Sequence, residues 1–446
     1  MARHISANRL YELPPDVKII SSVEHPGHER IDLTVEFTPQ GRICPKCGSS
    51  HCWIKESGKT RTVRHLPAAN RSVFITYKHR RYFCNDCHAT YYESVDWISD
   101  QFQMTNALLT DICLQLTDMV SIRDIARREH ITPAIVNDVL NMISIGRPES
   151  LPEVLCVDEF KGNAGVWNPE TGRWDKHKFL CNLTDGNSGV LIDVLPVING
   201  KYLIDYFKKF PLEERRKVKF FCCDMHSGFM YVAKECFPNA LICIDLFHVV
   251  NRVNIAMDQI RRRIQHELSK QKSAASEENY RLLKNSAYIL KTKEANKAKL
   301  WGIKQDERQE RLGQILELFP DISEMYDRLQ EFLVIVDEKS YAIQRMEFGN
   351  WLDRTASSEV PEIRSASSTL RHWRGYIQNG WKYHHSSGVC EGINNKIKVF
   401  KRISFGVHSF ENFRKRLLLI CGPIQLVRSP VDEIHDKISG TDDKAS

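Results

Sequence analysis

Two C-x-x-C pairs constrain the fold of this chain more than any other feature. Cys44 and Cys47 form the first pair, Cys84 and Cys87 form the second, and 36 residues separate Cys47 from Cys84. Each pair can present two thiolates to one ion through a tight turn, and four thiolates complete the closed tetrahedral site of structural zinc. The strand-like segment 72–83 between the pairs fits a zinc ribbon. A redox pair or buried free thiols would leave the basic character of that strand unexplained.

Five other residues near these pairs are interpreted as non-ligands: His51, Cys52, His65, His79 and His88. The 14 cysteines of the 446-residue chain are more consistent with metal ligands and buried thiols than with disulfides. Hydrophobic residues make up 42% and charged residues 27%, which is typical of globular proteins. No apolar run reaches the roughly 18–20 residues of a membrane span, and the N-terminus lacks the pattern of a secretory signal. We therefore expect a cytoplasmic protein of several domains.

Positive charge is concentrated in two stretches. The net formal charge is only +7, but residues 58–85 carry seven Lys or Arg and no Asp or Glu. Residues 389–417 carry seven more against two acids, Glu391 and Glu411. Such clusters favour a polyanionic partner, although either stretch alone is also typical of a solvated basic face. The candidate contacts in the first stretch are Arg61, Arg64, Arg71, Arg80 and Arg81.

A helix-turn-helix is predicted after the cysteine-rich segment. Ser121 and Asp124 have the spacing of a capping box that opens a helix. Thr132-Pro133 opens the next helix, with threonine as the N-cap and proline at the first helical position. This second helix, 133–143, would enter the DNA major groove. An ordinary helical hairpin is the alternative, and the neighbouring zinc ribbon favours DNA binding. The candidate contacts are Thr132 and Asn137.

Five short apolar segments then predict the strands of a mixed sheet. Turn signals separate the first three strands and favour antiparallel pairing, whereas helix-like segments around the fourth favour parallel crossovers. A ribonuclease-H-like domain has a mixed sheet of this order, although composition alone fits any α/β sheet. The strands are expected at 153–160, 177–184, 189–197, 217–224 and 240–245, and the helices at 201–210 and 229–237.

The flanking regions are also patterned. An earlier strand pair is expected at 17–20 and 31–37. Residues 250–380 are charged, helical in period and poor in strand signals. Two further helices are expected at 391–400 and 409–420, the second with Ser409 as its N-cap.

Two of the predicted core strands carry an aspartate at or near their ends. Asp158 lies near the end of the first strand and Asp224 ends the fourth, so that one sheet edge would hold both carboxylates. Mg²⁺ prefers such oxygen ligands, and two-ion phosphodiester cleavage needs carboxylates from separate elements. A strand-end aspartate is also a common turn former or helix cap. Asp245 competes for this role. Together with His248 it could contact the metal ligands without binding the metal itself, or the two could simply cap the next helix.

Several motifs resemble the bacterial insertion-sequence transposases of the ISL-three family. They are Asp158-Glu159-Phe160, the segment from Asp224 to Phe229, Phe237 to Ala240, Asp245 to Val249, and Gly388 to Lys398 followed by Lys401-Arg402 and Phe405-Gly406. The zinc ribbon and helix-turn-helix stand in the family's order. One departure is Leu246, where the family often has arginine, and this weakens a phosphate-contact role there.

The resemblance implies a DDE transposase whose triad falls on Asp158, Asp224 and Glu391. Spacing alone does not select Glu391, so this acid depends on the resemblance. The triad would hold two Mg²⁺ or Mn²⁺ ions, beside one structural zinc. Four basic residues after Glu391 would flank the scissile phosphate: Lys396, Lys398, Lys401 and Arg402.

The expected organisation is multidomain α+β, with a ribonuclease-H-like core interrupted by helices. The segments are a strand-containing segment (1–40), a zinc ribbon (41–98), a helix-turn-helix (104–148), the first part of the core (150–250), an all-helical insertion (251–380), the last part of the core with Glu391 (381–425) and a polar tail (426–446). The expected partners are terminal inverted repeats, target DNA and further copies of the chain. The alternatives are a non-catalytic DNA-binding regulator, which would lack a motif acid, and a protein whose main task is oligomer assembly.

Overall fold

Two separately packed units make up the chain in the computed structural model. The model describes residues 11–423 except positions 26, 28, 163, 164, 170, 177, 178, 272, 405 and 408. The first unit combines residues 1–147, 162–178 and 395–446, and the second combines 148–161 and 179–394. The predicted polar tail, 426–446, lies outside the described residues.

A four-stranded sheet begins the first unit, in the order β1-β2-β5-β4. Its strands are β1 (Lys18–His25), β2 (Arg30–Glu36), β4 (Thr60–Ala68) and β5 (Arg71–Lys78). The antiparallel pairing of β1 with β2 confirms the early strand pair. Alternate residues of β2 and β5 are buried, among them Leu33 and Ile75, because successive side chains of a strand point to opposite faces.

The cysteine-rich segment forms a second, three-stranded sheet in the order β3-β6-β7. Its strands are β3 (Cys52–Glu56), β6 (Arg81–Cys84) and β7 (Thr90–Tyr92). A buried ion pair joins Arg80, which precedes β6, to Glu93, which follows β7. Arg80 Nη1 donates to Glu93 Oε1 at 3.1 Å, and Arg80 Nη2 donates to the carbonyl oxygen of Phe37 at 3.2 Å.

Three helices complete the N-terminal part, and they share a core with the last helix of the chain. They are α2 (Asn106–Gln115), α3 (Ile122–Arg128) and α4 (Pro133–Met142), joined by α17 (Phe410–Cys421). Ser121 Oγ caps α3 by accepting from the Asp124 N–H at 3.0 Å. Ser409 likewise caps α17. Thr132 occupies the N-cap position of α4, but its side chain makes no capping hydrogen bond.

The first unit also includes a hairpin of β9 (Gly165–Asn168) and β10 (Arg173–Lys176). The sequence pattern indicated only turns here, because each strand has four residues and Asn168, Pro169 and Gly172 dominate the segment. Gly165 forms an isolated bridge with Ser409, so the hairpin reaches the start of α17.

The second unit is built on a five-stranded sheet in the order β12-β11-β8-β13-β14. Its strands are β8 (Val154–Lys161), β11 (Phe179–Asp185), β12 (Leu191–Leu195), β13 (Phe220–Cys223) and β14 (Leu241–Ile244). β11 pairs antiparallel with both β8 and β12, and β13 pairs parallel with both β8 and β14. The predicted mixed sheet is confirmed.

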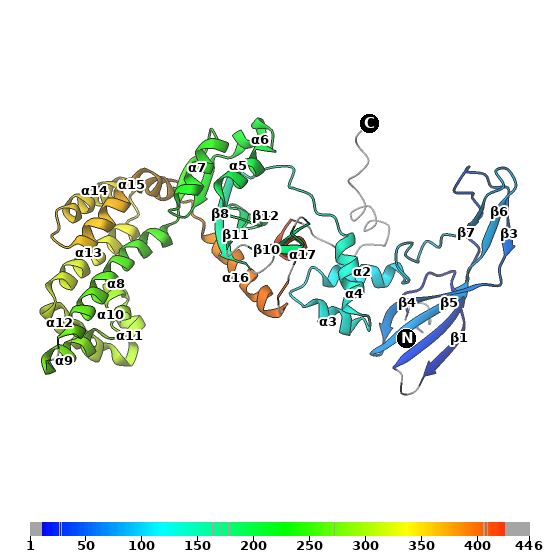
Figure 1. The fold of residues 1–446 in the computed structure, drawn as a ribbon, viewed down its shortest axis with the longest axis horizontal. Coiled ribbons are helices and arrows are strands. Elements are labelled where there is room, and N and C mark those ends of the chain that lie inside the picture. The colour runs from blue at the N-terminus through cyan, green and yellow to red at the C-terminus, as the bar shows by residue number, and fades with distance from the viewer. Residues whose placement is uncertain are drawn as a thin grey trace, which may run out of the picture. The chain divides into compact units, whose positions relative to one another are not determined.

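Helices connect the later strands of this sheet along the chain, and a long run of further helices follows its last strand (Figure 1). Apolar residues of α5, α7 and the sheet continue into the later helices as one core. The helices and 3₁₀ turns (η) are α5 (Gly200–Lys208), α6 (Leu212–Lys217), α7 (Ser227–Cys236), α8 (Leu246–Lys270), α9 (Ala274–Leu283), α10 (Ala287–Lys291), η1 (Glu294–Asn296), α11 (Lys297–Trp301), η2 (Gly302–Lys304), α12 (Gln305–Leu318), α13 (Pro320–Asp337), α14 (Tyr341–Ala356), α15 (Pro361–Tyr383) and α16 (Gly388–Ile403).

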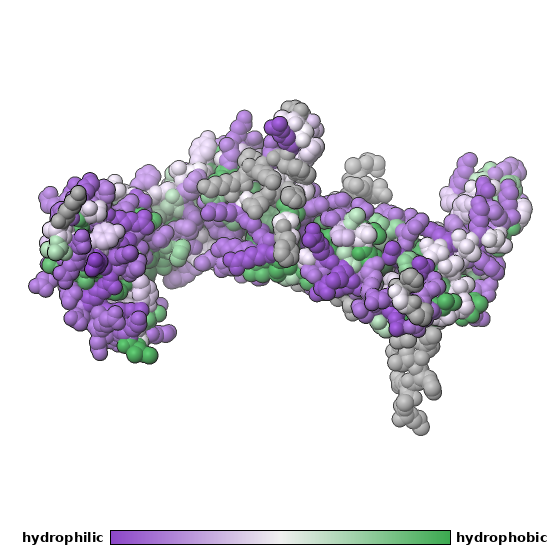
Figure 2. Space-filling view, turned by 60° about the horizontal axis from the view of Figure 1, so that its bottom comes forward, coloured by the Kyte–Doolittle hydropathy of each residue, from purple (hydrophilic) through white to green (hydrophobic). Residues whose placement is uncertain are grey.

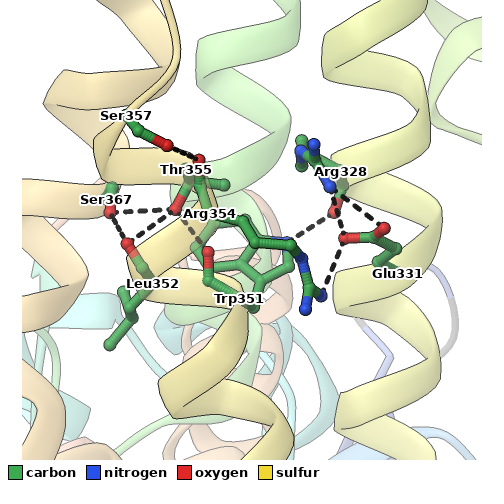
Figure 3. A network of polar contacts seen from close by, with 8 residues as sticks. All are labelled: Arg328, Glu331, Trp351, Leu352, Arg354, Thr355, Ser357 and Ser367. Atoms are coloured by element: carbon green, nitrogen blue, oxygen red, sulfur yellow. Dashed lines mark hydrogen bonds and ion pairs between the residues drawn. The ribbon is translucent and has the colours of Figure 1, made fainter.

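A polar network joins α13, α14 and α15 within this helical region (Figure 3). Trp351 Nε1 donates to the Arg328 carbonyl oxygen at 2.8 Å, and Arg328 Nη1 pairs with Glu331 at 3.1 Å. Thr355 Oγ1 contacts Ser367 Oγ at 2.9 Å. Because most of these groups are paired, the network links the three helices, and Arg328 Nε is its one side-chain polar atom that is buried without a partner among the described residues.

The visible surface of the helical region is mostly hydrophilic, with apolar residues in small patches (Figure 2). In the described part of the chain, no helix combines the length and the apolar character needed to cross a membrane.

We expect Glu93→Gln to lower the opening free energy of the β4–β6 region by roughly 3–5 kcal/mol, because it leaves the buried Arg80 guanidinium without its counter-charge. The side chains of Arg80 and Glu93 are 8% and 0% exposed. Hydrogen exchange of peptides from residues 60–98 measures this free energy.

The matched control is Glu36→Gln. Its carboxylate is 55% exposed and lies 3.8 Å from Lys78 Nζ, so the change should stay within about 0.5 kcal/mol. Equal protection in the two variants would contradict a stabilising role for the buried pair.

Candidate functional site

Two aspartates lie on neighbouring strands, Asp158 within β8 and Asp224 directly after β13. Cys156 of β8 is in register with Cys222 of β13, and the two strands run parallel. Asp158 and Asp224 each follow by two residues, so they share the face of their paired cysteines. The register of two buried strands therefore sets the distance between the carboxylates.

Burial, and then the negative charge of Asp224, raises the pKa of Asp158 to about 7. His248 Nε2 lies 2.8 Å from Asp224 Oδ1, and this carboxylate raises the pKa of His248. Asp224 Oδ1 is buried, and His248 is its ion-pair partner among the described residues. Two adjacent carboxylates with such an oxygen need a positive partner.

An amide pair holds Asp158 from the other side. Asn394 Nδ2 donates to Asp158 Oδ2 at 2.6 Å, and Asn182 Nδ2 donates to Asn394 Oδ1 at 2.6 Å. Asp158 Oδ1 accepts from the Glu159 N–H at 2.7 Å. Asn182 is fully buried in β11 and Asn394 is 6% exposed on α16. Both oxygens of Asp158 are thus oriented by hydrogen bonds.

Glu391 lies on the same helix as Asn394, one turn nearer its start, and is exposed. The preceding residue, Cys390, is fully buried and packs with Cys156 and Cys222 under the sheet. The structure does not bring all three carboxylates within 4.8 Å of one another, since the four ribbon cysteines are the set of potential ligands that it finds at that spacing among the described residues. Glu391 therefore lies one helical turn from Asn394, which contacts Asp158, and does not complete a single-ion cage with the aspartates.

Asp245 is 6% exposed and is engaged within the fold. Its Oδ1 accepts from the Phe247 N–H at 2.7 Å, which caps α8, and its Oδ2 accepts from Ser387 Oγ at 2.8 Å. Asp245 thereby links the end of β14 to the residue before α16. His248 is the member of this motif that reaches an aspartate of the pair.

The four ribbon cysteines converge on one point. Cys44 Sγ lies 3.6 Å from Cys87 Sγ, Cys47 Sγ lies 3.6 Å from Cys84 Sγ, and all four sulfurs lie within 4.8 Å of one another. Zinc–sulfur bonds of about 2.3 Å in a tetrahedron separate sulfurs by roughly 3.8 Å, so these residues fit the ion. Backbone N–H groups of Cys87 and Asp86 help to lower the pKa of Cys84 to about 6.

Local turns create this convergence. The Gly48 N–H donates to the Cys44 carbonyl oxygen at 2.9 Å, and the Cys84 N–H donates to that of Ala89 at 3.0 Å. Gly48 has φ +74°, which glycine adopts without strain. His88, at φ +55°, takes the equivalent conformation in the second knuckle.

The predicted DNA contacts differ in exposure. Arg80 is 7% exposed and is held by Glu93 and Phe37, so its prediction as a DNA contact conflicts with the structure. The remaining residues lie at least partly at the surface: Arg61, Arg64, Arg71, Arg81, Thr132, Asn137, Lys396, Lys398, Lys401 and Arg402.

Several of these residues also have partners within the chain. Arg64 Nη1 donates to the His130 carbonyl oxygen at 3.1 Å, and Arg71 lies 2.8 Å from Glu24. Arg81 Nη2 donates to Thr90 Oγ1 at 3.1 Å. The strand-borne arginines are therefore partly fixed before any ligand binds.

Sequence reasoning missed Asn182 and Asn394 as site residues. The signal for Asn182 was an amide inside an apolar strand, where an unpaired polar group would be costly. Asn394 belongs to the motif from Gly388 to Lys398. Functions were predicted for its neighbours Glu391 and Lys396, but none for Asn394 itself.

Three family models match successive parts of the chain. Residues 40–87 match the zinc-finger of transposase IS204/IS1001/IS1096/IS1165, residues 93–144 match the helix-turn-helix domain of transposase family ISL3, and residues 155–417 match the ISL3 transposase DDE model. The last match alone covers more than half of the chain. The chain belongs to the ISL3 family of transposases.

Relatives match over most of their length. The transposase for insertion sequence element IS1001 of Bordetella parapertussis is 22% identical over 401 residues, which are 88% of this chain and 93% of the relative. The transposase for insertion sequence element IS1557 of Mycobacterium tuberculosis is 23% identical over 390 residues, which are 82% of this chain and 83% of that protein.

We expect one zinc ion per chain and expect Cys47→Ser to lose it, because a closed structural site needs all four thiolates. Elemental analysis of the purified protein measures the occupancy. Cys52→Ser is the matched control, since the Cys52 thiol donates to the Ser49 carbonyl oxygen at 3.4 Å and is outside the four-sulfur set. Zinc loss in the Cys52 variant but not in the Cys47 variant would contradict this ligand set.

Proposed function

We propose that this protein binds the terminal inverted repeats of an insertion sequence, cleaves DNA at the element ends and joins 3′-hydroxyls to target DNA by two-metal phosphoryl transfer. The observation that supports this most is the pair Asp158 and Asp224 on adjacent strands, with Glu391 one turn of α16 from the Asn394 that contacts Asp158, in a chain of a transposase family. Such chemistry would place the protein with the DNA in the bacterial cytoplasm.

The core is interpreted as ribonuclease-H-like. Three antiparallel strands followed by two parallel ones, with β8 in the centre, agree with that fold. The helices from α8 to α15, between β14 and α16, then correspond to an all-helical insertion between the second aspartate and the glutamate.

Asp158, Asp224 and Glu391 would hold two Mg²⁺ or Mn²⁺ ions, which supply activation of the attacking water or 3′-hydroxyl and stabilisation of the leaving oxygen. The donor set fits hard cations, because it consists of carboxylates and includes a buried oxygen of Asp224 whose partner among the described residues is His248. Asn394 keeps one Asp158 oxygen oriented, and His248 stays beside Asp224.

DNA would be held by the zinc ribbon and by the helix-turn-helix, with α4 in the major groove. The predicted arginines and lysines that lie at the surface would contact phosphates and so fix the position of the protein on the duplex. Arg80 is excluded from this set because it is buried. We propose that a dimer or larger assembly forms on the DNA, as two element ends must be joined together.

We expect Asp158→Asn, Asp224→Asn and Glu391→Gln each to abolish Mg²⁺-dependent cleavage of a terminal-repeat duplex while leaving its binding affinity unchanged. Each change removes a charge that would hold a metal but keeps the shape of the side chain. Gel assays of cleavage and of binding measure the two effects separately.

Glu153→Gln is the control for these variants. Glu153 precedes β8 at the opposite end of that strand and lies 3.1 Å from Lys219 at the surface, so cleavage should persist. Full cleavage by any of the three acid variants would reject the triad, and a terminal-repeat duplex left unbound by the wild type would reject the transposase proposal.

We expect Asn394→Ala to reduce cleavage by about 10–100-fold, because groups that orient metal ligands typically contribute that much. Raising the Mg²⁺ concentration should recover part of the loss, which a merely structural defect would not show. Asn395→Ala, at an exposed neighbouring position, should cleave normally. An Asn394 variant whose Mg²⁺ dependence matches the wild type would contradict the positioning role.

A further inference from the structure

A cavity of about 450 Å³ lies among α3, α4, the end of α16 and the start of α17, all within the first unit. Its volume is within the range of roughly 300–1,000 Å³ that ligand sites occupy. Its described lining contains no Asp or Glu, and two of its side chains, Arg123 and Arg416, are cationic. The polar side chains of the lining are Ser121, Arg123, Asn137, Ser404, Ser409, Asn412 and Arg416.

Arg416 is the buried cation in the lining of this cavity. It is 2% exposed, and its Nη2 donates to the carbonyl oxygens of Asp118 and Val120 at 3.0 and 2.8 Å. Its Nε and Nη1 have no acceptor among the described residues. The guanidinium carbon lies 5.3 Å from the centre of the Phe400 ring, and burial lowers the pKa of Arg416 to about 10. The group stays charged at neutral pH, and although the charge of Asp118 acts on it, no carboxylate accepts from its Nε or Nη1 among the described residues.

Two helix starts border the same cavity. Pro133 and Asn137 belong to the first turns of α4, which has 10 residues, and Ser409 and Asn412 belong to the start of α17, which has 12. The first N–H groups of a helix lack intrahelical acceptors and give its start a partial positive charge. Both helix starts therefore add to the positive potential of the buried arginine.

The nearest acid on α3 is already engaged. Asp124 Oδ2 accepts from Ser121 Oγ at 2.6 Å, and its Oδ1 accepts from Arg127 at 3.0 Å. Arg123 is exposed at the rim of the cavity. An anion entering past Arg123 would meet unpaired donors and no opposing carboxylate in the described lining.

We propose that this cavity binds a phosphate group, and that the group is a backbone phosphodiester of the DNA contacted by α4. This source rests on the proposed function. A phosphate has oxygens enough to accept from both Arg123 and Arg416, and the partial positive charge of the two helix starts would favour its negative charge. The site would make α17, which follows the catalytic segment, part of the DNA-binding surface.

The experiment uses the full chain with three substitutions: Arg416→Met, Arg123→Gln and the control Arg128→Gln. Arg128 is an exposed residue of the same helix and is outside the cavity lining. The first probe is a 40-base-pair duplex, with affinity measured over a range of salt concentrations. The second probe is inorganic phosphate, compared with chloride at equal ionic strength in thermal melts.

We expect Arg123→Gln and Arg416→Met each to weaken duplex binding about tenfold and to reduce the slope of log K against log salt by about 0.9, as for one lost phosphate contact. Arg128→Gln should keep the wild-type slope. Arg123→Gln carries the test if Arg416→Met fails to fold, because Arg123 is exposed.

The other outcomes distinguish a phosphate site with another ligand from the absence of any phosphate site. An unchanged slope with loss of phosphate-specific stabilisation in both cavity variants would retain the phosphate site but reject DNA as its source. An unchanged slope with no phosphate-specific stabilisation of the wild type would overturn the inference while leaving the proposed function intact. Failure of the wild type to bind any duplex would count against the proposed function, and the melts would still report on the cavity.

Discussion

The placement of two half-buried aspartates on neighbouring strands, Asp158 in β8 and Asp224 directly after β13, is the constraint around which the second unit is organised. The register that pairs Cys156 with Cys222 places both acids on one face, and the small thiol side chains there leave room for Cys390 of α16 to pack against the strands. Burial of like charges is unfavourable without a cation or donors. Asn394 and His248 approach from α16 and α8 to supply part of what the pair needs.

Helix α16 connects this constraint to the rest of the chain. Its first residues belong to the second unit and its last residues to the first. The next helix, α17, is held to the helix-turn-helix by side chains that donate to main-chain carbonyls, such as Arg416 to Val120. One continuous helix and a short connection therefore separate Glu391 from α17 along the chain, and α17 packs against the helix-turn-helix.

What could be predicted depended on how local each signal was. The zinc ligands could be found because each C-x-x-C pair closes through its own turn. Asp158 and Asp224 could be suggested because strand ends of one sheet meet. Asn182 and Asn394 could not be paired, because 212 positions separate them and only the docking of α16 on the sheet brings the amides together. The short β9–β10 hairpin was missed because turn residues dominate its sequence.

The number of basic residues in a stretch was a poor guide to DNA contacts for a different physical reason. A run of basic residues does not reveal which side chains face inward. Arg80 was grouped with DNA contacts although Glu93 neutralises it inside the fold. In the basic stretch 389–417, Arg414 and Lys415 are each 8% exposed and donate to carbonyls at and beyond the end of α4, such as that of Asn141. Cations suit these positions because a helix end carries unsatisfied carbonyls and partial negative charge. The exposed cations of this stretch therefore belong chiefly to α16, and Arg414 and Lys415 of α17 serve to hold the helix-turn-helix in place.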